Sequence, residues 1–217
     1  MAAATPTSAD PPPDCPLCPR LTALRDELRT REPEWHNAPV ASFGDPAARL
    51  LIVGLAPGMR GANRTGRPFT GDYAGDLLYD TLEKFGFARG RYDRRADDGL
   101  ALVDCRITNA VRCLPPENKP TGVEVRTCRT FLTAELDGMP GLRAVLALGA
   151  LAHGAVLAAR GLRKSRYAFT HGAVHDLPGG LWLADSYHCS RYNTNTGRLT
   201  TPMFEAVFAE LRRLLNS

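Results

Sequence analysis

The sequence predicts an α/β fold of three layers, in which helices cover both faces of a central, mainly parallel, four-stranded sheet. Four short apolar runs of strand length, which begin at Leu50, Leu102, Leu142 and Leu181, carry this prediction. Helical segments separate the runs, and strands that alternate with helices form parallel sheets with right-handed crossovers. Polar loops follow three of the runs, and the carboxyl ends of parallel strands are where such folds bind ligands.

The elements alternate along the chain. We expect helices over 18–31, 73–85, 122–136, from 150 to about 160, and 202–215, strands over 50–53, 102–107, 142–148 and around Trp182, a charged solvated loop over 88–99, and a β-turn-β unit around His171. The second and third helices carry apolar side chains at helical spacing, at Leu77, Leu78, Leu82, Phe85, Val123, Val125, Phe131 and Leu132.

Composition is that of one globular domain. The 217 residues, 44% of them hydrophobic, can bury a full core, and we place this single domain over residues 14–217. Residues 1–13 are Ala, Thr, Ser and Pro-rich and predict a disordered tail rather than a secretory signal. No run of about 18 apolar residues is present to span a membrane. We therefore expect a cytoplasmic monomer without membrane contact.

The net charge of +4 is small, but its distribution is uneven. Two of the loops at strand ends share five arginines: Arg60, Arg64, Arg67, Arg191 and Arg198. Arginines gathered on one rim indicate an anionic partner.

The first of these loops covers residues 54–72. It contains five glycines, two prolines and three arginines, and it ends at Asp72. Glycines allow backbone amides to approach a ligand, and guanidinium groups bind phosphate. The Gly-Lys-Ser/Thr ending of a P-loop is absent, as is the GxGxxG spacing of dinucleotide sites. The alternative interpretation is a flexible connector.

Two further strands end in polar loops. His188 begins a loop of Ser, Asn and Arg residues, a mixture that suits nucleic acid because it offers cations for phosphate and amides for base edges. A lone histidine is otherwise often structural. Asn109 ends the strand before residues 110–120, and its amide matches N3–H and O4 of a uracil ring but not the reversed pattern of cytosine. The alternative for Asn109 is a turn residue.

Six cysteines are present, and four of them fall in two groups. Cys15 and Cys18 form a CxxC before the first helix, whereas fourteen residues separate Cys113 from Cys128. Their spacing leaves three interpretations open: an iron–sulfur cluster, a zinc ion, or unbound thiols. Cys105 lies in an apolar run, where a buried thiol is the ordinary interpretation.

Three motifs together resemble the type b (family 5) uracil-DNA glycosylases. They are Gly-Leu-Ala-Pro-Gly at 54–58 with the run 61–72, Thr-Asn-Ala-Val-Arg-Cys at 108–113 with Pro-Pro-Glu-Asn-Lys-Pro at 115–120, and Tyr-His-x-Ser-Arg-x-Asn-x-Asn-Thr-Gly-Arg-Leu at 187–199. The resemblance runs in order from Cys15 to the final helix. Members of this family are prokaryotic repair enzymes with a four-cysteine iron–sulfur cluster and a parallel sheet flanked by helices.

The resemblance implies a monofunctional hydrolase that cleaves the N-glycosidic bond of uracil in single- and double-stranded DNA and leaves an abasic site. It implies further deaminated substrates, such as hypoxanthine and xanthine, because the family is broad in its bases. It also implies a structural [4Fe-4S] cluster held by Cys15, Cys18, Cys113 and Cys128.

The resemblance also assigns roles at the site. His188 and Asp72 are the implied catalytic residues, the first at the departing base and the second as water activator or cation stabiliser. The implied base-binding residues are Phe69, which stacks, and Asn109, Asn118 and Asn193. The implied DNA-binding residues are Arg64, Arg67, Arg191 and Arg198.

This chain departs from related families and from its own at two positions. Residues 54–58 carry no polar side chain to hold the attacking water, so Asp72 is the nearest carboxylate, and Asp76 competes with it. Asp72 is alternatively the N-cap of the helix that follows. Cys189 stands where members often have proline, which would restrict the loop.

Two other classes of function compete with this assignment. One is a cluster-bearing or zinc-bearing DNA-binding module without catalysis, which would bind DNA and release no base. The other is a related repair enzyme with a preference for a different damaged base.

Overall fold

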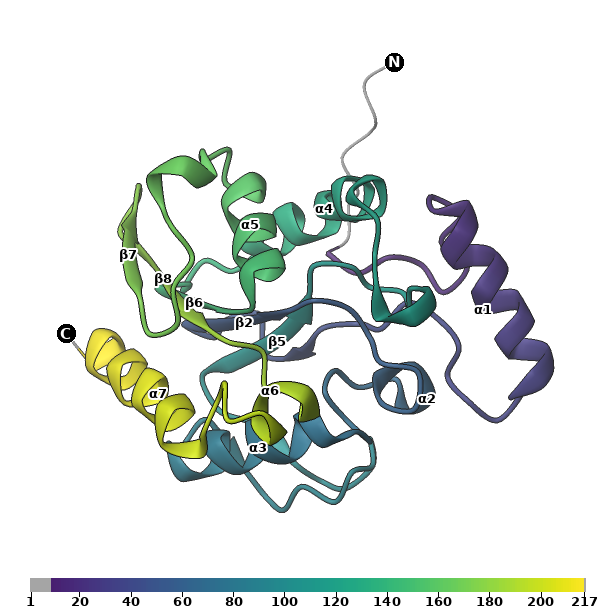
Figure 1. Ribbon diagram of the computed structural model, residues 1–217, viewed down its shortest axis with the longest axis horizontal. Coiled ribbons are helices and arrows are strands. Elements are labelled where there is room, and N and C mark those ends of the chain that lie inside the picture. Colours follow the sequence, from purple (N-terminus) through teal and green to yellow (C-terminus); the bar gives the residue numbers. More distant parts are fainter. Residues whose placement is uncertain (1–8, 217) are drawn as a thin grey trace.

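The computed structural model describes residues 9–216, and part of the predicted tail, residues 1–8, lies outside this range. Its centre is a six-stranded sheet with the order β1-β5-β2-β6-β8-β7. Helices α4 and α5 lie on one side of this sheet and α3 and α7 on the other (Figure 1). The prediction of a three-layer α/β fold with a mainly parallel sheet is therefore confirmed.

The four predicted strands form the parallel centre of the sheet: β5 (Cys105–Asn109), β2 (Leu50–Gly54), β6 (Ala144–Leu148) and β8 (Leu181–Ser186). The β2 and β6 strands are buried throughout, because helices cover both of their faces. In register, Gly54 pairs with Asn109 and Leu148 with Ser186, so the polar loops all leave from one edge of the sheet.

The predicted count of four strands is too low, because two antiparallel strands extend the edges. They are β1 (Phe43–Gly44), which pairs with β5, and β7 (Val174–Leu177), which pairs with β8. Both are short and only partly buried, so neither shows the continuous apolar pattern of the central strands.

Seven α-helices and two 3-10 turns connect the described strands. They are α1 (Pro19–Arg31), α2 (Ala62–Thr65), α3 (Tyr73–Lys84), η1 (Pro116–Asn118), α4 (Gly122–Asp137), α5 (Ala150–Ala159), η2 (Lys164–Arg166), α6 (Arg191–Asn195) and α7 (Thr201–Asn216). Alternate residues of each central strand face opposite cores, as expected for a pleated strand. Leu50 and Ile52 pack with α3 and α7, and Leu51 and Val53 pack with α4 and α5.

Three local predictions differ from the structure. The run 102–107 is not one strand: β4 (Ala101–Leu102) pairs with β3 (Ala88–Arg89), and the backbone breaks at Asp104, which has a φ of 53°. The loop 88–99 is only partly solvated, because the Asp98 carboxylate is buried against Arg67. Residues 9–13 are held to the domain, since Asp10 accepts hydrogen bonds from the Ser42 amide (3.0 Å) and the Arg112 guanidinium (2.7 Å).

In the part of the chain that the structure describes, no helix has both the length and the apolar character needed to cross a membrane.

Candidate active site

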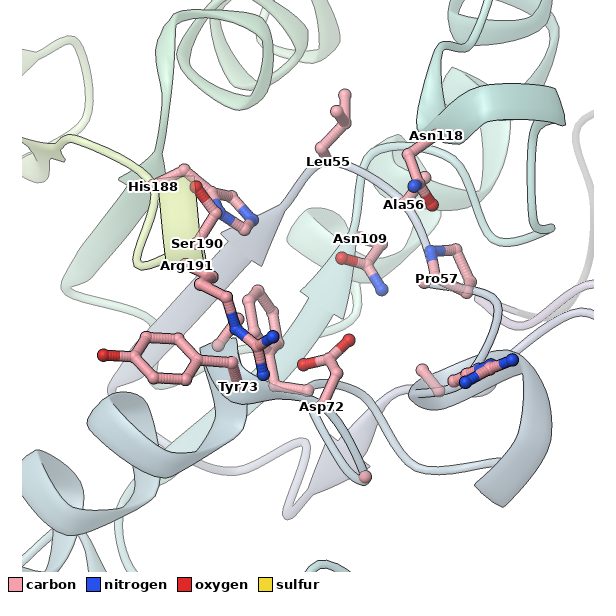
Figure 2. Close-up of a pocket in the computed structure, with 16 residues that line it drawn as sticks. Leu55, Ala56, Pro57, Asp72, Tyr73, Asn109, Asn118, His188, Ser190 and Arg191 are labelled. Atoms are coloured by element: carbon pink, nitrogen blue, oxygen red, sulfur yellow. The ribbon is translucent and has the colours of Figure 1, made fainter. Parts of the chain in front are cut away.

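A cavity of about 690 Å³ opens at the carboxyl edge of the parallel strands. All three motif loops contribute to its lining, which consists of Leu55, Ala56, Pro57, Gly58, Arg60, Ala62, Phe69, Gly71, Asp72, Tyr73, Ala74, Asn109, Asn118, His188, Ser190 and Arg191. Figure 2 shows Asp72, Asn109 and His188 pointing into this space from three different parts of the chain. The three loops therefore meet at one site, as expected from the order of the strands.

Phe69 and Asn109 form the floor of the cavity beside Gly54. Both side chains are buried, and a Cβ atom added at Gly54 would lie 2.4 Å from Asn109 Oδ1 and 2.6 Å from the Phe69 ring. Only glycine at this position leaves room for both groups. Asn109 Oδ1 is buried and has no hydrogen-bond partner in the protein. A buried acceptor without a partner is costly, so this oxygen is suited to a ligand donor.

The position of the Phe69 ring depends on a strained backbone conformation that two tyrosine hydroxyls stabilise. Its φ is 53°, a conformation that bulky residues rarely adopt. The Tyr92 hydroxyl donates to the Phe69 carbonyl (3.2 Å), and the Tyr79 hydroxyl donates to the Pro68 carbonyl (2.7 Å). A Cβ at Gly75 would clash with the same Phe69 carbonyl, which explains the glycine in the first turn of α3. No sequence pattern indicated the role of either tyrosine.

Asp72 precedes α3, but its side chain does not cap that helix. Its carboxylate lies over Gly58 and Gly61, where added Cβ atoms would lie 2.8 and 2.2 Å from Oδ2, and Oδ1 is buried without a protein partner. Burial raises the pKa of Asp72 above its ordinary value. The Gly75 and Ala74 amides lower this pKa by a smaller amount, and neither amide has hydrogen-bond geometry to the side chain. The competing carboxylate, Asp76, is instead paired with Arg94 at 2.6 Å.

His188 lies across the cavity from Asp72, two residues after the end of β8. Burial lowers its pKa to about 4, so the imidazole is neutral near pH 7. The ring stacks against Phe69 with centroids 5.8 Å apart. Asn193, which its motif predicted to be a base-binding residue, does not line the cavity. Its amide donates to the His188 carbonyl (2.8 Å), and so it supports the histidine loop.

Three of the four predicted DNA-binding arginines are exposed, and the fourth is buried. Arg64, Arg191 and Arg198 are exposed, and Arg191 lies over the Tyr73 ring at 5.3 Å. Asn118 is exposed at the rim. The prediction of Arg67 as a DNA-binding residue is wrong, because its side chain is only 5% exposed and forms two hydrogen bonds of 2.7 Å with Asp98. Its cation instead holds the loop 88–99 against the first motif.

Cys15, Cys18, Cys113 and Cys128 border one small cavity beside α1, together with Val111 and Phe131. The Arg112 amide donates to Cys128 Sγ (3.3 Å). Burial raises the pKa of Cys18 to about 11 and that of Cys113 to about 12, so the free thiols are protonated near pH 7. Cys189 and Cys105 are buried in the main core.

A buried polar group that no sequence motif indicated lies below the histidine loop. The Asp185 carboxylate forms hydrogen bonds with His153 Nδ1 (2.7 Å) and His175 Nε2 (3.2 Å). His153 Nε2 donates to the Tyr167 carbonyl (2.9 Å). Both separations from Asp185 are hydrogen-bond lengths, so the three side chains form one hydrogen-bonded group. Burial lowers the pKa of His153, but the hydrogen bond to Asp185 and the charge of that carboxylate together outweigh burial and raise the pKa above its ordinary value.

Comparisons with known proteins define the class of this protein. The sequence model described as Uracil DNA glycosylase superfamily matches residues 41–212, which contain the cavity and all three motifs. The chain therefore belongs to the uracil-DNA glycosylase superfamily.

Relatives place the chain more narrowly. It is 50% identical over 206 residues to the type-5 uracil-DNA glycosylase of Thermus thermophilus, and the match covers 92% of this chain and 93% of that protein. The type-5 enzymes of Mycobacterium leprae and Pyrobaculum aerophilum are 43% and 42% identical over 211 and 204 residues, each match covering 92% of this chain and 91% and 87% of the relative. The chain is a member of this type-5 group, as its motifs predicted.

Proposed function

We propose that this protein releases uracil from DNA by hydrolysis and leaves an abasic site, using Asn109 and Phe69 to hold the base and Asp72 and His188 for the chemistry. The chain is a uracil-DNA glycosylase, an enzyme that hydrolyses N-glycosyl bonds in DNA repair. One observation carries the residue assignment. Two buried oxygens without protein partners, Asp72 Oδ1 and Asn109 Oδ1, border the same cavity as a neutral His188.

The floor of the cavity selects the base. Asn109 Oδ1 accepts from uracil N3–H while the same amide donates to O4, and Phe69 stacks on the ring. Cytosine presents an acceptor at N3 and a donor at N4, so it would face like groups on the amide. Asn109 therefore binds uracil and rejects cytosine.

Asp72 and His188 act on opposite charges of the reaction. Cleavage of the C1′–N1 bond leaves positive charge on the sugar and negative charge on the base. The Asp72 carboxylate stabilises that cation and accepts a proton from the water whose oxygen bonds to C1′. The neutral His188 ring donates a hydrogen bond from its N–H to O2 of the departing base and stabilises the negative charge that develops there. A preorganised donor of this kind costs no reorganisation when the charge develops.

The cavity supports a broad range of bases. Its volume of about 690 Å³ and its small lining residues Ala56, Gly58 and Ala62 leave room for a purine, so hypoxanthine and xanthine join uracil in the proposal. The DNA is single- or double-stranded, and Arg191 at the rim fills the gap that a flipped nucleotide leaves in a duplex. The monomeric state and the cytoplasmic location stay predictions.

A [4Fe-4S] cluster on Cys15, Cys18, Cys113 and Cys128 belongs to the same proposal. Among the residues that the structure describes, no three of these sulfurs lie within 4.8 Å of one another, whereas tetrahedral zinc needs sulfurs about 3.8 Å apart. The proposal is supported by the four thiols around one small cavity and by the Arg112 amide, which donates to Cys128 Sγ as amides do to cluster ligands. Such a cluster would tie α1 to the loop after Asn109. The purified protein should contain iron and sulfide, and Cys113→Ser should lose both and unfold at lower temperature.

Single-turnover excision from a uracil oligonucleotide tests the chemistry. Asp72→Ala and His188→Ala should each slow excision by about 10²–10³ while affinity for an uncleavable abasic duplex is kept. Asp76→Ala is the matched control, because its carboxylate pairs with Arg94 outside the cavity. Excision by Asp72→Ala at the parent rate would refute the assignment. Binding of DNA with no base release by the parent protein would favour the non-catalytic module.

A further inference from the structure

The positive charge of this protein is concentrated in residues 138–204. This segment has seven arginine and lysine residues, two aspartates and no glutamate, so its positive charge exceeds the +4 of the whole chain. One of the two aspartates, Asp185, is fully buried against His153. The helix α5 and the strands β7 and β8 contain no arginine or lysine, so the cations of this segment lie in η2, in α6 and in the connecting loops. Of these cations, only Arg191 and Arg198 belong to the motif loops.

Three of these cations gather on and beside the turn η2. Arg163, Lys164 and Arg166 are exposed, and none of them forms an ion pair within residues 9–216. Lys164 is nevertheless held in place, because its side chain lies along α5 at Gly154, where an added Cβ would lie 2.3 Å from Nζ. Unpaired cations on an ordered turn are a surface that an anionic partner would complete.

Ring contacts connect the residues that follow this turn, Phe169 and His171, to the residue before His188. The Tyr187 ring, one residue before His188, stacks on His171 with centroids 5.0 Å apart, and the Tyr187 amide donates to His171 Nδ1 (3.1 Å). Tyr187 also contacts Phe169, at 6.2 Å, and the Arg198 guanidinium lies 4.6 Å over its ring. Phe169 and His171, which follow the turn, are thus packed against Tyr187, the residue before His188.

We propose that Arg163, Lys164 and Arg166 bind backbone phosphates of the DNA that flanks the flipped nucleotide on the His188 side of the cavity. The helix α2, which carries Arg64, and the strand β8 lie on opposite sides of β2 and β5 (Figure 1). A strand that delivers one nucleotide to the cavity continues in both directions, so cations on both flanks would hold it. This inference rests on the proposed function, because it takes DNA as the partner.

The salt dependence of DNA binding tests the proposal. The probe is a duplex with a tetrahydrofuran abasic analogue, which the enzyme cannot cleave, and its dissociation constant is measured by fluorescence anisotropy at several salt concentrations. Removal of one phosphate-binding cation lowers the magnitude of the log–log slope by about 0.9. The triple variant Arg163→Gln, Lys164→Gln, Arg166→Gln should therefore bind more weakly at low salt, with a slope smaller by roughly 2–3. Its single-turnover excision at saturating enzyme should equal that of the parent.

A matched variant removes the effect of net charge alone. Arg89→Gln, Arg91→Gln, Arg143→Gln loses the same three charges from exposed positions away from the cavity, and its slope should stay near that of the parent. Equal slopes for both triple variants, or an unchanged slope for the first, would overturn the proposal. The failure of the proposed function has a different result: the parent protein would release no uracil, whatever the slopes.

Discussion

Substitution of Gly54 by alanine should disable the cavity with little change in the rest of the fold. The added Cβ would lie 2.4 Å from Asn109 Oδ1 and 2.6 and 2.8 Å from two carbons of the Phe69 ring. Carbon atoms in ordinary contact are about 3.5–4.0 Å apart, so the ring must move by about 1 Å. Gly54 and Asn109 are paired residues of β2 and β5, and the sheet cannot relieve the overlap by sliding. The ring and the amide must therefore give way.

The expected cost is larger for activity than for stability. A displacement of about 1 Å in groups that position a substrate costs about 10²-fold in rate, whereas overpacking a core costs about 1–3 kcal/mol. Single-turnover excision of uracil measures the first and denaturant unfolding the second. Gly54→Ala should also discriminate poorly against cytosine, because Asn109 is one of the two displaced groups.

Gly122→Ala is the control for this substitution. Gly122 begins α4, and the nearest side-chain atom to an added Cβ is 3.7 Å away, so alanine there should be neutral or stabilising. If Gly54→Ala excised uracil at the parent rate, then Phe69 and Asn109 would not hold the base in the geometry described above.

Charges near the site carry two further predictions. Asp98→Asn leaves Arg67 buried without its carboxylate partner, which should destabilise the fold by about 3–5 kcal/mol, whereas Asp97→Asn, in an exposed pair, should have little effect on denaturant unfolding. The excision rate should show no inflection near pH 6.5, because burial has already lowered the pKa of His188 to about 4. The rate should fall at more acidic pH, as His188 and Asp72, whose pKa burial raises, take up protons. An inflection near pH 6.5 that is lost in His188→Ala would contradict a neutral His188.

The prediction from sequence was most successful where the signal is local. The central strands at Leu50 and Leu142 are buried on both faces, and their continuous apolar runs show it. The motif loops were placed at one edge of the sheet, because parallel strands end there. The edge strands were missed, since two residues in β1 and a half-buried β7 have no periodicity to detect.

The roles of individual polar side chains depended on tertiary contacts. Arg67 and Arg64 are three residues apart in one loop, and only the fold buries the first against Asp98 and exposes the second. Asn193 lies in the histidine motif but turns back to the His188 carbonyl rather than to the cavity. A loop sequence does not specify which of its polar groups find partners elsewhere in the chain.

The sequence by itself determined the fold class, the family and most of the residues that meet at the cavity. Apolar periodicity and the spacing of long motifs are properties of neighbouring residues, and they are present before any segment packs against another. The tertiary structure decided which acceptors stay unpaired and why Gly54 must be glycine. It also decided that Asp72 is a partly buried carboxylate over Gly58 and Gly61 instead of a helix cap. These features depend on burial and on distances between segments far apart in the chain, and burial is fixed only when all the segments pack together.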